Sequence, residues 1–156
     1  MYKIVIAGGG FAGISALRAF SRKPRQLRNK LEIVIIDKKP NFEFLPMLPD
    51  VAGGWLGPDR IMLRIDELAK SMSAKFIRDE IKEIDLNNKN IKTIGQTITY
   101  DYLMLSAGSE TNFFGNDAFR EKCYCLDSSD DAISLRERVI GQSVTASENI
   151  IVVGGG

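Results

Sequence analysis

The stretch YKIVIAGGGFAGISA, residues 2–16, decides the fold of this chain. Tyr2–Ala7 is a short β-branched run that stops at three glycines, which is the pattern of a buried strand ending in a tight turn. After the glycines, apolar residues recur every three positions with alanines between them, so residues 11–22 are predicted to form a helix packed closely on a sheet. The chain therefore opens with a strand, a glycine turn and a helix.

A second apolar run completes this unit. Leu31–Ile36 shows no polar alternation after Glu32, which indicates a parallel strand covered on both faces. Asp37 ends the run, so residues 2–37 form a predicted βαβ unit. A βαβ unit of this kind is typical of a Rossmann-like α/β domain with a central parallel sheet and flanking helices.

The segments after residue 37 begin with a long loop. Residues 38–59 hold four of the five prolines and cannot be regular secondary structure throughout, and a loop of this length is usually functional. Apolar spacing on both sides of the turn at 87–90 predicts a small antiparallel β-meander between residues 81 and 100. Further elements are predicted as a helix over 61–71, strands over 74–78, 102–105 and 150–153, and a helix that Ser128 or Ser129 caps and that runs to Val139.

The glycine turn has the spacing of a dinucleotide-binding motif. Gly8, Gly10 and Gly13 form the pattern GxGxxG between a strand and a helix, and Asp37 ends the next strand. Gly8 permits the turn, Gly10 has no Cβ to hold the backbone away from a pyrophosphate, and Gly13 lets the helix lie close to the strand. Asp37 is expected to accept hydrogen bonds from the adenosine ribose, and its charge disfavours a 2′-phosphate. The N–H groups expected to face the phosphates are those of Phe11, Ala12 and Gly13.

The composition limits the other classes of function. With 156 residues, 44% of them hydrophobic and 26% charged, the chain is expected to form one compact domain with one core. Its 21 basic and 20 acidic residues leave a net charge of +1, so no field of one sign is available to hold a nucleic acid. The sequence has no histidine, which excludes Ser-His-Asp hydrolases, Cys-His proteases and most zinc enzymes. We therefore expect no nucleic-acid partner and no metal site.

Cysteine usage and hydropathy predict the compartment. Cys123 and Cys125 are too few and too close together for a disulfide framework, which favours a reducing, cytoplasmic setting. The apolar run at residues 4–7 is far shorter than the core of a signal peptide, and no run approaches the ~18 apolar residues that span a bilayer.

Three motifs in the same order as in a known superfamily extend this interpretation. The chain resembles the pyridine nucleotide-disulfide oxidoreductase superfamily, flavoproteins with an FAD domain interrupted by an NAD(P)H domain, in YKIVIAGGGFAGISA, YDYLMLSAGSETNFFG and NIIVVGGG. Within it, the chain is similar to type II NADH dehydrogenases in NFEFLPMLPDVAGG, SETNFFG and LDSSDDAISLRERV. The resemblance covers essentially the whole chain and implies FAD as the cofactor, NADH as the substrate of the parent protein and a quinone as the electron acceptor.

The resemblance also implies which residues meet the cofactor. The FAD pyrophosphate would lie at Gly8, Gly10, Phe11, Ala12 and Gly13, and the ribose at Asp37. Lys38 would lie beside the adenine, and Ile81 would meet the adenine through its backbone. Ala107 and Gly108 would close over the cofactor, and Pro46 would approach the isoalloxazine or ribityl group. No side chain is implied as a catalytic acid or base.

Departures from the superfamily pattern leave alternatives open. Residues 38–72 contain no cysteine, which argues against a disulfide reductase. Sulfide:quinone oxidoreductases use a cysteine shortly before the helix that starts near Ser129; Cys125 lies close by, but the matching position is Asp127. A sulfide:quinone oxidoreductase or a ferredoxin reductase relative is therefore the alternative enzyme. A non-catalytic adenine-nucleotide-binding module is the alternative from another class, and the flavin content would separate it from the enzymes.

The last glycines suggest where the domains divide. Residues 1–148 are expected to be the N-terminal portion of an FAD-binding domain, incomplete as a fold, and residues 149–156 the first strand and glycine loop of an NAD(P)H-binding domain. On this interpretation the chain alone holds FAD weakly, oxidises no NADH and forms a homo-oligomer through uncovered apolar surface. The parent protein is expected to be cytoplasmic and to associate peripherally with the cytoplasmic face of a membrane.

Overall fold

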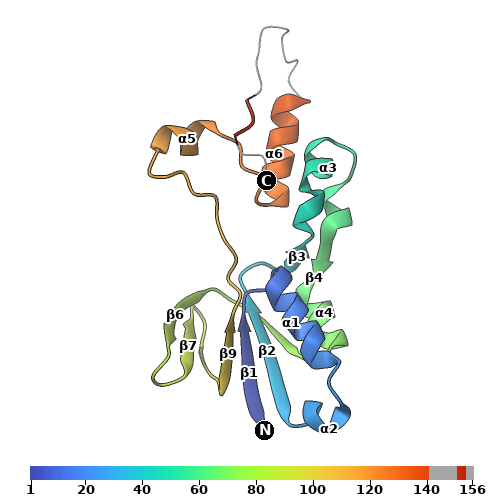
Figure 1. Cartoon of the computed structure of the whole chain (residues 1–156), viewed down its shortest axis with the longest axis vertical. Helices are drawn as coiled ribbons and strands as arrows, with labels where there is room; N and C mark the ends of the chain where they lie inside the picture. The colour runs from blue at the N-terminus through green and yellow to red at the C-terminus, as the bar shows by residue number, and fades with distance from the viewer. Residues whose placement is uncertain (141–150, 154–156) are drawn as a thin grey trace. The chain divides into compact units, whose positions relative to one another are not determined.

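The computed structural model describes residues 1–140 and 151–153 of the chain (Figure 1). The chain divides into two compact units. The first unit consists of Met1–Phe44 and Met62–Glu110, and the second of Leu45–Ile61 and Thr111–Gly156.

The first unit is built on a four-stranded parallel sheet. Its strands are β1 (Tyr2–Ala7), β2 (Leu31–Asp37), β5 (Lys75–Arg78) and β9 (Tyr102–Leu105), in the order β5-β2-β1-β9. The central strands β1 and β2 pair in parallel with Val5 opposite Val34, and both residues are buried. The predicted parallel sheet is thus confirmed. Its central strands are uninterrupted apolar runs because both of their faces are covered.

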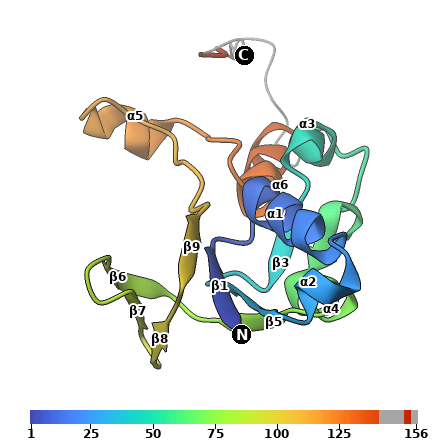
Figure 2. The ribbon, with the colours of Figure 1, turned by 60° about the horizontal axis from the view of Figure 1, so that its bottom comes forward.

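Alternate residues of the central strands point into two separate cores. Ile6 and Ile35 pack on one face of the sheet with Leu17 of α1 (Phe11–Ser21) and Ile65 of α4 (Ile65–Ser71). Their chain neighbours pack on the opposite face, against β6 (Ile81–Asp85), β7 (Asn90–Thr93) and β8 (Thr97–Thr99). Helices therefore cover one face and an antiparallel meander covers the other (Figure 2), as the sequence predicts.

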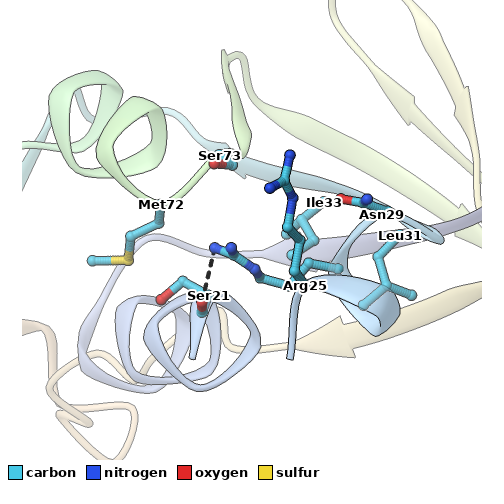
Figure 3. A pocket seen from close by; sticks show the side chains of 8 residues that line it. Ser21, Arg25, Asn29, Leu31, Ile33, Met72 and Ser73 are labelled. Atoms are coloured by element: carbon cyan, nitrogen blue, oxygen red, sulfur yellow. Dashed lines mark hydrogen bonds between the residues drawn. The ribbon is translucent and has the colours of Figure 1, made fainter. Parts of the chain in front are cut away.

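A short helix that the sequence did not predict follows α1. This helix, α2 (Arg25–Arg28), has four residues and no buried side chain, so it lacks the apolar periodicity from which a helix is predicted. It borders a pocket near the amino-terminal end of β2 (Figure 3).

The proline-rich segment forms only short elements. Within the first unit, β3 (Asn41–Glu43) pairs antiparallel with β4 (Met62–Arg64). The predicted helix over 61–71 is therefore wrong at its start, since α4 begins at Ile65, whose N–H donates to the Pro40 carbonyl at 3.0 Å. The apolar residues before Ile65 fit a helical spacing, but their pairing with a strand 21 residues earlier takes precedence.

The second unit has a core of its own, which corrects the expectation of a single core. Leu48 and Val51 of α3 (Leu48–Ala52) are buried with Ala132 of α6 (Ser129–Val139). The Ser128 side chain caps α6 by accepting a hydrogen bond from the Asp131 N–H at 3.2 Å, as predicted. The remaining elements of this unit are η1 (Leu45–Met47), η2 (Pro58–Ile61) and the unpredicted α5 (Asp117–Lys122).

The strand predicted over 150–153 is not formed by its described residues. Ile151, Val152 and Val153 are exposed, and no segment of the described chain pairs with them. A strand needs a hydrogen-bonded partner, and the apolar run alone does not supply one. Residue 150 and the predicted domain boundary at 148/149 lie outside the described residues.

Candidate dinucleotide-binding site

The candidate site lies at one edge of the parallel sheet, where all four strands end. The glycine loop follows β1, and Asp37 ends β2. Ile81 comes shortly after the end of β5, and residues 106–108 follow β9. Because the strands are parallel, their carboxyl ends share this edge. In open α/β sheets, ligands bind in the crevice outside these carboxyl ends.

Two glycines of the loop are required by packing against protein backbone. Gly8 has a φ of +109°, and a Cβ there would overlap the carbonyl oxygen of Ser106. A Cβ on Gly13 would overlap the carbonyl oxygen of Gly8, so this glycine lets α1 lie against the turn. Both positions exclude a side chain because of the fold itself.

Gly10 differs from these two because its missing side chain faces open space. A Cβ built on Gly10 would meet no atom within 4 Å. Gly10 is the N-cap of α1, no side chain caps the helix there, and its first turn contains no acidic residue. The N–H groups of Phe11 and Ala12 therefore end the helix at an exposed surface, where partial positive charge favours an anion. This geometry fits a pyrophosphate.

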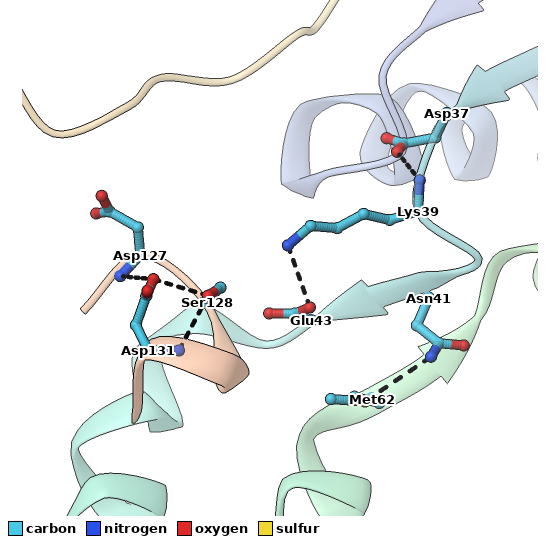
Figure 4. A network of polar contacts seen from close by, with 8 residues as sticks. All are labelled: Asp37, Lys39, Asn41, Glu43, Met62, Asp127, Ser128 and Asp131. Carbon is cyan, nitrogen blue, oxygen red and sulfur yellow. Dashed lines mark hydrogen bonds and ion pairs between the residues drawn. The ribbon is translucent and has the colours of Figure 1, made fainter. Parts of the chain in front are cut away.

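Asp37 ties the glycine loop to the end of β2. Its Oδ2 accepts a hydrogen bond from the Gly9 N–H at 2.5 Å. Its Oδ1 accepts one from the Lys39 N–H at 2.7 Å (Figure 4). A carboxylate has about four acceptor positions, so two remain for the hydroxyls of a ribose. Asp37 therefore fits the predicted role and also positions the loop. The sequence did not indicate the part played by Gly9.

Ser106 is a second residue that the sequence analysis missed. Its N–H donates to the Ala7 carbonyl at 2.8 Å, and its Oγ lies 3.0 Å from the carbonyl oxygens of both Ala7 and Gly8. Ser106 thus holds the loop after β9 against the glycine turn. Its position directly before Ala107 and Gly108, two predicted site residues, is the signal that would have found it.

Four further predicted residues lie at the same edge. Lys38 is exposed, and its charge adds to a hydrogen bond from Lys82 in lowering the pKa of Glu80. Ile81 is half-buried, and Ala107 and Gly108 are exposed. Gly108 has a φ of +80° and open space where a Cβ would stand. Pro46 is the exception, because it lies exposed in η1 of the second unit and does not belong to this group.

Asp79 organises the loop between β5 and the meander. Its Oδ2 accepts hydrogen bonds from the Thr93 hydroxyl at 2.6 Å and the Gly95 N–H at 3.0 Å, and its Oδ1 accepts one from the Glu80 N–H at 2.8 Å. The Thr93 hydroxyl is the main cause that lowers the pKa of Asp79. The Asp79 N–H also donates to the Asp37 carbonyl at 3.1 Å, which joins this loop to the end of β2.

An aromatic group stands beside the start of α1. The ring of Phe11 lies 5.0 Å from that of Phe42 and 5.4 Å from that of Phe44, measured between centroids. Lys39 and Glu43 form an ion pair at 3.3 Å in the same segment (Figure 4). These contacts fix β3 close to the N-terminus of α1.

The fold and the glycine loop together define an α/β protein with a dinucleotide-binding site. The chain belongs to the pyridine nucleotide-disulphide oxidoreductase family, whose model matches residues 2–156. The family prediction made from the sequence motifs is thereby confirmed.

Individual relatives within this family are quinone-reducing enzymes. The chain is 29% identical over 150 residues to the type II NADH:quinone oxidoreductase NdhA of Mycobacterium tuberculosis, covering 90% of this chain and 30% of the relative. It is 28% identical over 152 residues to the sulfide-quinone reductase of Aquifex aeolicus, covering 97% and 34% respectively. The structure of NDH2 from Plasmodium falciparum in complex with NADH superposes with a TM-score of 0.77 at 23% identity, covering 88% of this chain and 28% of that one.

These percentages also show how much of the relatives' length the chain covers. The chain spans about 30% of the length of NdhA.

Within residues 1–140 and 151–153, no helix is both long and apolar enough to cross a membrane. Cys123 is exposed and Cys125 half-buried, and neither is in a disulfide.

Proposed function

We propose that this chain binds FAD as part of an NADH dehydrogenase that passes electrons from NADH through FAD to a quinone. The observation that carries the proposal is the open space at Gly10 beside an uncapped helix N-terminus. The similarity to a type II NADH:quinone oxidoreductase supports the choice of substrate and acceptor. The residues at the sheet edge account for the adenosine diphosphate half of the cofactor.

The side chains and backbone groups of the chain have distinct tasks in this proposal. Phe11, Ala12 and Gly13 donate their N–H groups to the pyrophosphate, and Gly10 allows its close approach. Asp37 accepts hydrogen bonds from the ribose through the lone pairs that Gly9 and Lys39 leave free. Bound FAD supplies the hydride and electron chemistry.

The outer parts of the cofactor would meet other residues. Lys38 and the backbone of Ile81 flank the adenine, while Ala107 and Gly108 close over the cofactor after β9. The positive φ of Gly108 and the space beside it support a close backbone approach there. Pro46 approaches the isoalloxazine or ribityl group. The chain has no histidine, and no side chain at the sheet edge is assigned as an acid or base.

A competition experiment tests the cofactor assignment. The chain is titrated with FAD, ADP and FMN, and binding is followed by calorimetry. We expect FAD and ADP to compete for one site and FMN not to bind, because most of the residues proposed for the site serve the adenosine diphosphate half. Binding of FMN as tight as that of FAD would contradict the proposal. Binding of ADP tighter than that of FAD would favour the adenine-nucleotide module.

A second candidate function is sulfide oxidation with a quinone as acceptor. The similarity to a sulfide-quinone reductase over 97% of the chain and the two free cysteines favour it. Against it, the position matched to the sulfide enzymes' cysteine is Asp127, whose carboxylate accepts hydrogen bonds from the N–H and hydroxyl of Thr111. Loss of sulfide-dependent quinone reduction in Cys125→Ser of the whole parent protein, with NADH oxidation unchanged, would favour this candidate.

Location and assembly belong to the same proposal. Because quinones are lipid-soluble, we propose a cytoplasmic protein that meets the cytoplasmic face of a membrane peripherally. The homo-oligomer expected from the sequence stays a prediction. Light scattering across a dilution series tests it, and a monodisperse monomer at high micromolar concentration would contradict it.

A further inference from the structure

Segment 18–30 concentrates positive charge in a protein that is otherwise acidic. It contains six basic residues and no acidic one, whereas the rest of the chain has 15 basic and 20 acidic residues. None of the six forms an ion pair within the part of the chain that the structure describes, although Lys3, Lys39, Arg60, Arg64, Lys75, Lys82 and Lys92 all do. The basic residues of the segment are Arg18, Arg22, Lys23, Arg25, Arg28 and Lys30.

Two of these arginines line a pocket of about 570 Å³. Arg25 and Arg28 come from α2, Ser21 from the end of α1 and Ser73 from the segment after α4 (Figure 3). Arg28 donates one hydrogen bond from Nη1 to the Ser21 carbonyl at 3.2 Å. A guanidinium has five N–H donors, so four remain on Arg28. The lining of the pocket therefore includes two cations and two hydroxyl groups, of which the Ser21 hydroxyl donates to the Arg18 carbonyl at 2.8 Å.

The strand β2 contributes apolar side chains to the pocket and no carboxylate. Leu31 and Ile33 are among the lining residues, and alternation along a strand places Glu32 on the opposite face of the sheet. The Glu32 carboxylate is paired there with Lys75 at 3.0 Å and Lys3 at 3.7 Å. The hydrogen bond from Lys75 is the main cause that lowers the pKa of Glu32, so this carboxylate stays charged and occupied.

Helix C-termini alone do not account for this concentration of cations. The carbonyl ends of α1 and α4 both face this region and favour positive charge. However, backbone N–H groups already donate to these carbonyls: Arg22 to Arg18, Met72 to Leu68, and Ala74 to Ala69. The Arg28 side chain donates to one further carbonyl, and the Arg25 side chain donates to none among the described hydrogen bonds. A purely structural role would thus leave most of the donors unused.

We propose that this pocket binds a phosphate group whose carrier has an apolar portion that rests on Leu31, Ile33 and Met72. Arg25 and Arg28 are its ligands, because guanidinium groups bind phosphate through paired N–H donors. The pocket lies at the opposite end of α1 from Gly10, about 16 Å away along the 11-residue helix. It is therefore distinct from the dinucleotide site and independent of the function proposed for it.

The test compares two double variants that remove the same charge from the same segment. Arg25→Gln/Arg28→Gln changes the pocket, and Arg18→Gln/Arg22→Gln changes basic residues that do not line it. Binding of inorganic phosphate and of hexyl phosphate is followed through the amide resonances of Asn29 and Ser73 at fixed ionic strength. Cosedimentation with phosphatidylglycerol vesicles, against phosphatidylcholine vesicles, tests a lipid headgroup as the source of the phosphate. The melting temperature reports on folding.

The proposal predicts saturable binding of hexyl phosphate, weakened at least about tenfold in Arg25→Gln/Arg28→Gln and less than about twofold in Arg18→Gln/Arg22→Gln. Cosedimentation that depends on phosphatidylglycerol and follows the same order would assign the phosphate to a lipid. Saturable binding of hexyl phosphate without cosedimentation would assign it to a free ester. Equal weakening in both double variants, or no saturable binding of either phosphate in a protein that unfolds cooperatively on heating, would overturn the proposal.

Discussion

The two sides of the glycine loop use the same residue type for different reasons. On the side toward the sheet, Gly8 and Gly13 are in contact with backbone atoms that leave no volume for a Cβ. On the side toward solvent, Gly10 has no neighbour within 4 Å of where a Cβ would stand. The first two glycines are thus required by packing, whereas no packing contact among the described residues requires the third. Separating stability from affinity at these positions would test this distinction.

The largest effect is expected on the side toward the sheet. Gly8→Ala forces a side chain into a φ of +109° and against the Ser106 carbonyl, so we expect the free energy of unfolding to fall by about 3 kcal/mol or more. Gly13→Ala should also destabilise through its overlap with the Gly8 carbonyl, although alanine otherwise favours a helix. Urea unfolding measures both. An alanine tolerated at Gly8 would mean that the turn is not held by Ser106.

Asp37 connects the two sides of the loop, so its replacement should affect both stability and affinity. Asp37→Ala removes the acceptors of the Gly9 and Lys39 N–H groups and those offered to a ribose. We expect FAD affinity to fall by roughly 1–3 kcal/mol, the scale of a hydrogen bond to a charged group. Asp37→Asn is the matched control, because it keeps one carbonyl acceptor and should retain part of the affinity. Unchanged FAD binding in Asp37→Ala would place the ribose elsewhere.

On the side toward solvent, affinity should change more than stability. Gly10 has a φ of −75°, which alanine adopts without strain, so Gly10→Ala should lower the free energy of unfolding by no more than about 1 kcal/mol, the cost of an alanine at an N-cap. FAD and ADP should bind more weakly by about 1–2 kcal/mol, because a methyl group holds the pyrophosphate away from the N–H donors. Calorimetric titration beside urea unfolding separates the two quantities. A loss of stability equal to that of Gly13→Ala would remove the distinction between the two sides.

The sequence predicted what depends on local pattern and missed what depends on pairing across the chain. The strands of the βαβ unit are apolar runs that are buried on both faces of the sheet. The predicted bounds of β1 and β9 are confirmed, and β2 extends one residue further than predicted, to Asp37. The start of α4 was predicted four residues too early. The residues before it form β4, which pairs with β3, and the segment between these two strands contains the separate helix α3, so no local pattern indicates the pairing. The helices α2 and α5 have too few buried residues to show a period.

In the site, too, the residues of a local motif were predicted and those that act across the chain were missed. The glycine spacing and Asp37 form a local motif, and the structure brings them to one edge of the sheet. Ser106 and Asp79 act through hydrogen bonds to residues 98 and 14 positions away, which no spacing in the sequence indicates. Position near a strand end is the physical property that these missed residues share with the predicted ones.

The smallest effect on stability is expected at Asp79. Its carboxylate, and not a closely packed glycine, organises the loop between β5 and the meander. The Thr93 hydroxyl, and after it backbone N–H groups, lower the pKa of Asp79 in the folded protein below the ordinary value of 3.8. The resulting stabilisation is fully present above the unfolded pKa and is lost as the pH falls through the folded pKa. Thr93→Val should raise the pKa of Asp79 and lower stability slightly at pH 7, and this difference from the original protein should shrink below pH 4. Carboxyl resonances of Asp79 and urea unfolding at pH 7 and pH 3 measure the two effects. A stability difference that stays constant between these pH values would show that Thr93 acts through packing and its hydrogen bonds with Gln96, and not through the Asp79 carboxylate.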